Sequence, residues 1–322
     1  MARAKITIVG LGLVGSSIGV ALCQGDREFE VIGHDREPGI AAAARKAGAV
    51  DRTEWNLLRA CEDADFIILA LPAMAIRETM EAITHVLKPG CVITDTASIK
   101  EPVLRWADEL LPSSVHFVGG DPILRHPEGG ITAGVGSAEL LRGAIYCLCP
   151  APTTAPDAVQ VVANLVSRLG AQPLFLDASE HDGLMAGADR LPAVLAIALL
   201  EVTALTAPWQ EMRKLAGAQY QSATWLSSSD PAIYCDAMLA NRENVVRWID
   251  TYIAGLQRWR QRILEGKPDT LKKSLEQMLA AREQWQQQKA SGRWEGSERE
   301  SLAEIPSPWQ SLFGIRRRLR KP

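Results

Sequence analysis

The sequence predicts an α/β protein with a doubly wound, mainly parallel sheet that is followed by an all-helical domain. Three observations support this fold class. Short β-branched runs alternate with longer amphipathic runs over residues 5–177, which is typical of βαβ units and a parallel sheet. A glycine-rich turn follows the first of these runs. Beyond residue 177 the strand signals fade and long helical patterns replace them.

The β-branched runs predict the strands of the first domain, residues 1–177. Several runs are apolar at consecutive positions, as in strands that are covered on both faces. The expected strands are Ile6–Val9, Phe29–His34, Phe66–Leu71, Val92–Asp95, His116–Gly119, Ala144–Cys149 and Pro173–Asp177. Several of the helices between them begin near Pro or a small polar residue and end near Gly. These helices are Ser16–Gln24, Gly39–Lys46, Ala73–Leu87, Glu101–Leu110 and Asp157–Leu169.

The second domain, residues 178–290, is expected to be all-helical. Its helices are His181–Thr206, Trp209–Ala216, Ile233–Gly255 or longer, and Thr270–Lys289. The apolar run Leu191–Leu200 is about half of the ~20 residues that a membrane span needs, so it predicts a buried helix and no transmembrane segment. Residues 291–322 predict a flexible basic tail, with contact to an acidic partner or a membrane surface as the alternative.

Composition narrows the class of protein. The 322 residues exceed what one core usually holds, and 47% hydrophobic with 23% charged residues is typical of a soluble globular protein. A net charge of -3 disfavours nucleic-acid binding through a globally positive surface. The six cysteines have neither Cys-x-x-Cys nor zinc-finger spacing, which predicts reduced core thiols and no metal site. The N-terminus lacks a secretory pattern, so we expect a cytoplasmic protein.

A dinucleotide site of the Rossmann type is predicted at the first strand. The motif is Gly10-Leu11-Gly12-Leu13-Val14-Gly15, which follows the strand and opens a helix whose N-terminus favours phosphate. Asp35 stands about 20 residues further along, where an acid accepts hydrogen bonds from the adenine ribose. NAD is therefore the expected cofactor. NADP stays possible, because Arg36 offers a partner to a 2′-phosphate.

Two further loops are expected at the nicotinamide end, because ligands bind beyond the carboxyl ends of parallel strands. The first contains Leu71 and Pro72, and the second contains Ser98. The Ser98 hydroxyl is a candidate to bridge nicotinamide and substrate. The alternative is that Asp95 or Ser98 only caps the following helix.

These residues resemble the prephenate/arogenate dehydrogenase family of tyrosine biosynthesis over most of residues 5–285. The matching segments are Gly10–Gly15, Asp95–Lys100, Phe117–Gly120, Pro122, Gly130, Leu141–Gly143, His181-Asp182, Leu191-Pro192, Asp230-Pro231 and Asn241. The resemblance implies a helical domain that forms a homodimer. It also implies NAD(P)-dependent oxidative decarboxylation of a carboxylated cyclohexadiene, which converts prephenate to 4-hydroxyphenylpyruvate or arogenate to tyrosine.

The chain departs from the family pattern at three substrate-site positions. Asp121 replaces the histidine that assists proton loss from the ring hydroxyl in the family. A carboxylate can accept that proton, but it is a weaker base than imidazole unless burial raises its pKa. Arg190 replaces a second histidine, and Trp225 replaces an arginine that binds a substrate carboxylate in the family. An indole has one neutral donor and cannot supply that two-pronged contact.

Two arginines offset these losses. Arg125 stands where the family has glycine, and together with Arg190 it is a candidate to bind a carboxylated substrate. The alternative is that both are solvated side chains beside a pocket that is no longer used. His181 matches a family His-Asp pair and is expected at the edge of the substrate site, with a helix-capping or hinge role as the alternative.

Three functions are compatible with this pattern. The first is dehydrogenation of prephenate or arogenate, in which Ser98 positions the reactants and Asp121 is the base. The second is dehydrogenation of another carboxylated compound, which the altered pocket favours. The third is a catalytically retired NAD(H)-binding regulator.

Overall fold

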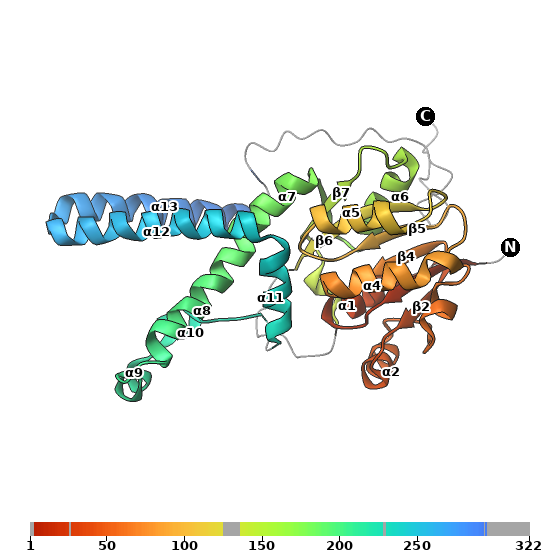
Figure 1. Ribbon diagram of the computed structural model, residues 1–322, viewed down its shortest axis with the longest axis horizontal. Coiled ribbons are helices and arrows are strands. Elements are labelled where there is room, and N and C mark those ends of the chain that lie inside the picture. The colour runs from red at the N-terminus through yellow and green to blue at the C-terminus, as the bar shows by residue number, and fades with distance from the viewer. Residues whose placement is uncertain (1–2, 26, 125–135, 228–229, 293, 295–322) are drawn as a thin grey trace. The chain divides into compact units, whose positions relative to one another are not determined.

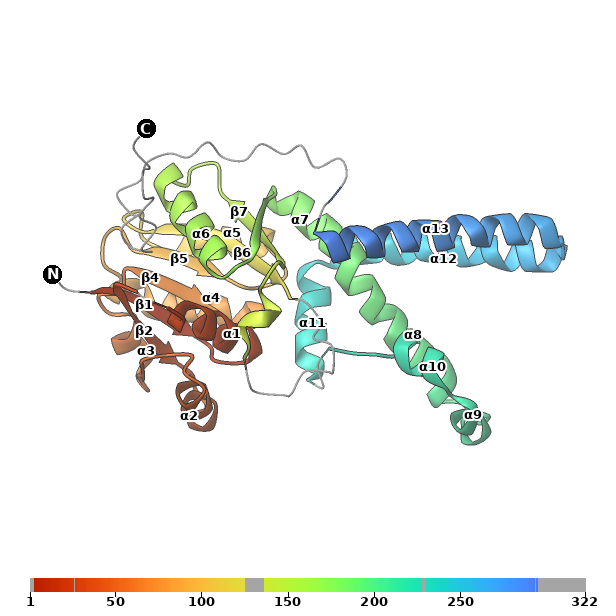
Figure 2. The same ribbon diagram turned by 180° about the vertical axis from the view of Figure 1, so that it is seen from behind.

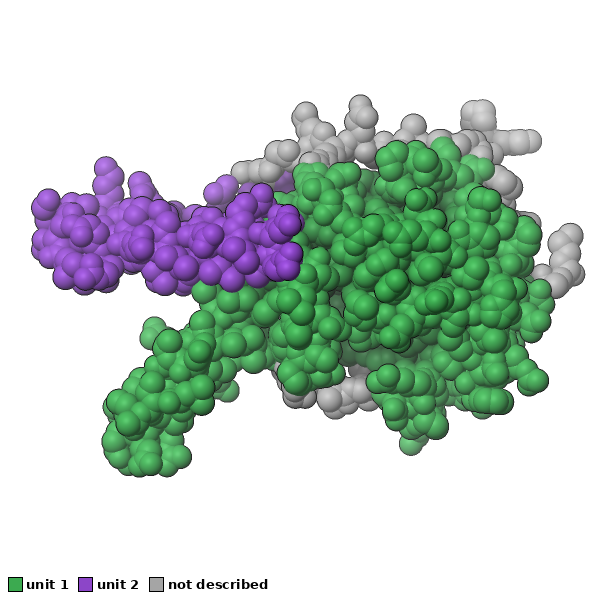
Figure 3. Space-filling view, viewed as in Figure 1, with its two compact units in different colours: residues 1–241, 306–322 green, residues 242–305 purple. Residues whose placement is uncertain are grey.

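The computed structural model describes residues 3–25, 27–124, 136–227, 230–292 and 294. The chain divides into two compact units, one containing residues 1–241 and the other residues 242–305 (Figure 3). The division after residue 241 does not coincide with the end of the sheet, so it does not test the predicted domain boundary at residue 177, which stays a prediction. Nearly all of the predicted basic tail, residues 291–322, lies outside the described residues.

One eight-stranded sheet forms the centre of the first unit, in the order β3-β2-β1-β4-β5-β6-β7-β8 (Figure 1). All neighbouring strands are parallel except β6 and β7, which are antiparallel. The strands are β1 (Ala4–Val9), β2 (Phe29–His34), β3 (Arg52–Thr53), β4 (Phe66–Leu69), β5 (Val92–Asp95), β6 (His116–Ile123), β7 (Ile145–Pro150) and β8 (Gln172–Phe175). The predicted fold class is confirmed. Because β1 lies between β2 and β4, the chain order reverses there and opens a crevice for a ligand.

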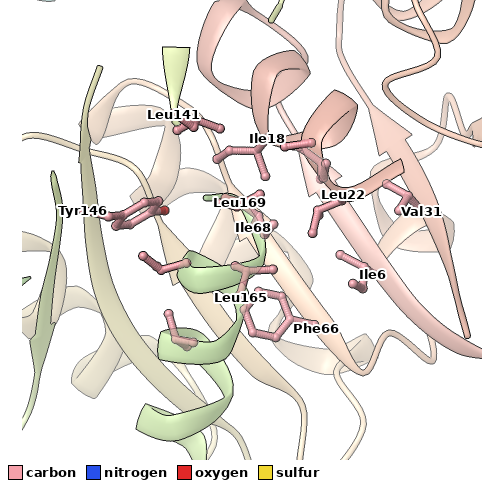
Figure 4. Close-up of a cluster of buried hydrophobic side chains, with 14 of the residues drawn as sticks. Ile6, Ile18, Leu22, Val31, Phe66, Ile68, Leu141, Tyr146, Leu165 and Leu169 are labelled. Atoms are coloured by element: carbon pink, nitrogen blue, oxygen red, sulfur yellow. The ribbon is translucent and has the colours of Figure 1, made fainter. Parts of the chain in front are cut away.

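Helices cover both faces of the sheet (Figures 1 and 2). They are α1 (Leu13–Cys23), α2 (Pro38–Lys46), α3 (Leu57–Cys61), α4 (Ala73–Ile83) with the 3-10 turn η1 (Thr84–Val86), α5 (Glu101–Leu110), the 3-10 turn η2 (Ala138–Leu140) and α6 (Pro156–Arg168). Residues of α1 and α6 pack on one face, where Leu22, Phe66 and Leu165 are fully buried (Figure 4). Residues of α4 and α5 pack on the other face around Ile67 and Met80. Burial on both faces explains the continuous apolar runs of the strands.

Strand β6 is longer than its sequence predicts. A strand that ends at Gly119 is expected, but β6 continues to Ile123, so Asp121 lies within the sheet. The cause is the antiparallel neighbour β7, which pairs Asp121 with Cys147. The two-residue strand β3 and the five-residue helix α3 are also absent from the prediction, since neither is long enough to show a period.

Beyond the sheet the first unit is helical, as predicted. Its elements are α7 (Ala178–Met185), the π-helical turn η3 (Ala186–Arg190), α8 (Leu191–Ala204), α9 (Trp209–Leu215), α10 (Ala218–Ala223) and α11 (Pro231–Ala240). The continuous helical run Ala178–Ala204 has the length and apolar composition of a membrane span, with a mean hydropathy of 1.6. Only 17% of its most apolar window is buried inside the structure. The expectation of a buried helix at Leu191–Leu200 is therefore wrong for a single chain. An exposed apolar helix of this kind is typical of an interaction surface.

The described residues of the second unit form two helices, α12 (Arg242–Glu265) and α13 (Pro268–Ser291), which lie side by side in both views (Figures 1 and 2). The expected single helix from Ile233 is interrupted, because Asn241 ends α11 outside the helical region. The turn to α13 uses Gly266 with φ of 61°, a conformation that glycine adopts without strain. Large apolar side chains such as Leu256 and Leu279 are more than half exposed on these helices.

Candidate active site

The glycine-rich turn joins β1 to α1 and is shaped for close backbone packing. Gly10 has φ of 91°, and a Cβ atom there would lie 2.2 Å from the Ala70 carbonyl oxygen. A Cβ atom on Gly15 would lie 1.9 Å from the Gly10 oxygen. Gly12 instead borders open space and is the N-cap of α1, without a side-chain cap. The first N–H groups of α1 have no side-chain cap, and a phosphate group at this helix N-terminus stays a prediction from the motif.

Asp35 follows β2 at the same end of the sheet. Its Oδ2 accepts a hydrogen bond from the Leu11 N–H at 2.8 Å, and its Oδ1 accepts one from the Glu37 N–H at 2.9 Å. These bonds hold the carboxylate beside the glycine turn. A hollow of about 660 Å³ adjoins it, lined by Asp35, Arg36, Pro38, Ala41, Ala42, Arg45, Lys46, Thr53, Glu54 and Trp55. Both cationic and acidic side chains thus border the predicted adenosine end.

A second cavity, of about 270 Å³, lies where the loops after β1, β4 and β5 meet residues of the helical segment. It is lined by Gly12, Leu13, Val14, Ala70, Leu71, Pro72, Ala73, Thr96, Ala97, Ser98, Ile99, Arg190, Ile233, Asp236 and Ala237. The structure therefore brings one predicted substrate residue, Arg190, together with predicted residues of the phosphate and nicotinamide ends of the cofactor site. The geometry supports the expectation that carboxyl ends of parallel strands share one ligand site.

Arg190 is a charged side chain of this cavity that contacts both the Ser98 loop and the neighbouring Asp189. It ends the π-helical turn, a feature that is frequent at functional sites. Its Nη2 donates a hydrogen bond to the Ser98 hydroxyl, and its Nη1 lies 2.9 Å from Asp189 Oδ2. Its Nε is buried and has no hydrogen-bond partner among the described residues. The side chain is only 9% exposed, so this guanidinium is a largely buried cation at the cavity wall.

Asp121, His181 and Asp182 form a second cluster, between β6 and α7. His181 has no exposed surface, and its two ring nitrogens contact one carboxylate each. Nε2 lies 3.2 Å from Asp121 Oδ2, and Nδ1 lies 2.9 Å from Asp182 Oδ1. Burial raises the pKa of Asp121, although the hydrogen bond to His181 opposes this. Burial lowers the pKa of His181, but the bonds to Asp121 and Asp182 outweigh it and raise that pKa to about 11.

Lys100 and Asp95 form a buried ion pair that supports the Ser98 loop. Neither side chain has exposed surface. Lys100 Nζ contacts Asp95 Oδ2 and donates to the Gly120 carbonyl oxygen at 2.7 Å. Asp95 also accepts hydrogen bonds from the backbone N–H groups of Ala97 and Gly120, at 2.9 and 3.0 Å. The pair thereby joins the end of β5 to β6.

Two other predicted substrate residues, Trp225 and His181, are not among the described residues that line this cavity. Trp225 is 55% exposed and is not among the described residues of the cavity wall. Arg125 lies outside the described residues. His181 was expected at the edge of the substrate site, but it is buried beneath Asp121. The sequence patterns predict no individual role for Lys100, Asp182 or Asp236. Lys100 and Asp182 do belong to segments that match the family, and that match is the one signal for them in the sequence.

Comparisons with known proteins agree with this arrangement. Residues 18–174 match the family of prephenate dehydrogenase nucleotide-binding domains, and residues 177–277 match that of prephenate dehydrogenase dimerization domains. The chain is 30% identical over 259 residues to the prephenate dehydrogenase of Lactococcus lactis, covering 77% of this chain and 68% of the relative. It is 28% identical over 280 residues to the cyclohexadienyl dehydrogenase of Zymomonas mobilis, covering 86% and 94%.

A solved structure shows the same fold. The crystal structure of A. aeolicus prephenate dehydrogenase with hydroxyphenyl propionate and NAD+ superposes with a TM-score of 0.79. The two chains are 22% identical, and the match covers 88% of this chain and 99% of the other. Together, the two matched domains and the 30% identical relative show that this chain belongs to the prephenate dehydrogenase family.

Proposed function

We propose that the protein is a dehydrogenase that oxidatively decarboxylates prephenate or arogenate with NAD. The observation that carries the proposal is the cavity in which the glycine turn, the Ser98 loop and the Arg190 guanidinium meet. Membership of the prephenate dehydrogenase family supports the same activity. We further propose that the exposed apolar surface of α8 is covered by a second copy of the chain, as the match to a dimerization domain suggests.

The residues at the crevice fit a nicotinamide dinucleotide. Gly12 and the N-terminus of α1 would hold its phosphates, and Leu71, Pro72 and Ser98 would border its nicotinamide end. When bound, the nicotinamide ring supplies the hydride acceptor. Asp35 would accept hydrogen bonds from the adenine ribose and repel a 2′-phosphate, which favours NAD over NADP.

The cofactor preference can be tested with Asp35→Asn. The amide retains an acceptor for the Leu11 N–H but loses the negative charge. We expect the wild-type protein to bind NADH more tightly than NADPH, and the variant to lose roughly tenfold in NADH affinity while its NADPH affinity is kept or increased. Fluorescence titration with each nucleotide measures both constants. If the wild type bound NADPH more tightly than NADH, the NAD preference would be wrong. The cationic side chains of the adjoining hollow, Arg36, Arg45 and Lys46, would then be the groups that bind the 2′-phosphate.

In the proposed reaction the protein binds and orients the substrate and accepts one proton. Arg190 would bind a carboxylate of the cyclohexadiene through its guanidinium group and hold it beside Ser98. Asp121 would accept the proton of the ring hydroxyl while hydride leaves the ring carbon that bears this hydroxyl. Loss of CO2 from the ring then supplies the electron pair that aromatises it, and the proton returns to the phenolic oxygen. The transferred hydride, the released CO2 and the aromatic product together account for all atoms and electrons of the substrate, so the reaction needs no further co-reactant.

The deciding experiment measures NADH formation with prephenate and with arogenate, for the wild type and for Arg190→Gln. We expect turnover by the wild type and a fall in kcat/KM of about 30-fold or more in the variant, because a buried charged contact is lost. The control is Arg105→Gln, which removes an exposed arginine of α5 and should leave the rate unchanged. An unchanged rate in Arg190→Gln would remove Arg190 from the substrate site.

The other two candidate functions predict different outcomes of the same assay. NADH binding without turnover on either acid, but with turnover on another carboxylated compound, would indicate a changed substrate. NADH binding without turnover on any such compound would indicate a retired enzyme that acts as a regulator.

A further inference from the structure

On its Nδ1 side, the imidazole of His181 is fixed by Asp182, which backbone groups of α5 and the Asn241 side chain hold in turn. Asp182 holds its Nδ1, and that carboxylate also accepts hydrogen bonds from the N–H groups of Lys100 and Glu101, at 2.6 and 2.9 Å. These two N–H groups open α5, whose N-terminus favours a negative charge. The Asp182 carbonyl oxygen accepts a hydrogen bond from Asn241 Nδ2 at 2.7 Å. Asp182 is therefore held in place as a hydrogen-bond acceptor, and Nδ1 of His181 is the donor to it.

A second proton must lie between Nε2 of His181 and Oδ2 of Asp121. Two acceptors at 3.2 Å without a proton between them would repel each other, so either the ring or the carboxyl holds it. Imidazole is the stronger base of the two. Lys100, at the N-cap of α5, favours the ionised form of Asp121, while Asp95 opposes it. The proton belongs on the ring, which leaves an imidazolium between two carboxylates.

The groups that face this imidazolium come from every element packed against it. They are Asp121 on β6, Asp182 on α7 itself, and the Cys147 thiol on β7. Lys100 and Asp95 lie one layer further away and neutralise each other. Around His181 the two contacting carboxylates therefore outnumber the single positive charge.

The free oxygen of Asp121 gives this arrangement a chemical use. Oδ2 is occupied by His181, whereas Oδ1 accepts no hydrogen bond from any residue that the structure describes. The side chain is 6% exposed, and Oδ1 is the oxygen that the contact with His181 leaves unused. When a cation holds one oxygen of a carboxylate, it orients the group and favours its ionised form. The second oxygen can still accept a proton.

We infer that His181 is a positioning residue whose imidazolium orients Asp121 and keeps it ionised, so that the carboxylate oxygen rather than an imidazole nitrogen accepts the substrate proton. The inference rests on the proposed function, because it assumes a hydroxyl proton to be accepted. In the step, the substrate O–H bond breaks and an Asp121 Oδ1–H bond forms, while His181 keeps both of its protons. The family histidine at position 121 is thereby replaced by a two-residue unit.

The protonation state can be measured without turnover. In the full-length protein labelled with 15N-histidine, we expect the His181 ring to show both N–H protons through neutral pH, with His181→Gln used for assignment. In Asp121→Asn the His181 titration should move to lower pH, because the ring loses one of its two carboxylates. A His181 ring that titrates near its ordinary pKa of 6.5 in the wild type would overturn the inference.

The pH profile of kcat/KM gives the second readout. The acidic limb reports ionisation of the base, and loss of the neighbouring cation should raise the pKa of Asp121 further. We therefore expect the acidic limb of His181→Gln to move to higher pH by about one unit or more, with His85→Gln, an exposed histidine, unchanged. A lower rate with an unmoved limb would show a merely structural role and overturn the inference. Absence of turnover in the wild type would instead overturn the proposed function, and the ring titration would still decide the state of His181.

Discussion

Replacing Asp121 by Asn should lower kcat by about 10²- to 10⁴-fold, the usual contribution of a general base. Asn has nearly the same shape and can still accept a hydrogen bond from His181, but its amide cannot take up a proton. The reference pKa of an aspartate makes it a weak base, and burial raises the pKa of Asp121 toward a more useful value. Steady-state rates with prephenate or arogenate measure the effect.

The matched control is Asp108→Asn, the same chemical change at an exposed position of α5. Its rate should equal that of the wild type. NADH affinity should be preserved in both variants, because Asp121 is not among the described residues that line the crevice. If Asp121→Asn retained the wild-type kcat, the proton would have to pass to another group, and Asp121 would lose its assigned role.

Most of the sheet was predictable because its strands are buried on both faces. Phe29–His34 and Val92–Asp95 match the observed strands at both ends. The extension of β6 through Asp121 was not predictable. Gly119 and Gly120 suggest the end of a strand, and only the antiparallel pairing with β7, distant in the sequence, continues it.

The candidate site was predictable where one rule of topology applies. The glycine turn, Leu71 and Ser98 share a cavity because they all follow parallel strands. The contact between Ser98 and Arg190 spans 92 positions in the sequence, and no local pattern encodes it. The same holds for Asp121 and His181, 60 positions apart. Family resemblance placed these residues near one another, but it did not predict that a carboxylate and an imidazole would pair.

The buried Lys100–Asp95 pair leads to the largest expected effect on stability. We expect Lys100→Met to lower the free energy of unfolding by about 3–5 kcal/mol, because it leaves the Asp95 carboxylate buried without its cation. The Met side chain fills most of the volume, so the loss is electrostatic rather than a cavity effect. Urea unfolding of the NADH-free protein measures it.

The cause can be isolated with a double-mutant cycle that adds Asp95→Asn. The single variant Asp95→Asn should also be destabilised, since Lys100 is then unpaired and one of the two backbone N–H bonds to Asp95 loses its acceptor. In Lys100→Met/Asp95→Asn no buried charge is left over. The loss in the double variant should therefore be smaller than the sum of the two single losses, by roughly 0.5–3 kcal/mol. Strictly additive losses would mean that the two charges do not stabilise each other, and that the backbone hydrogen bonds of Asp95 alone hold the Ser98 loop against β6.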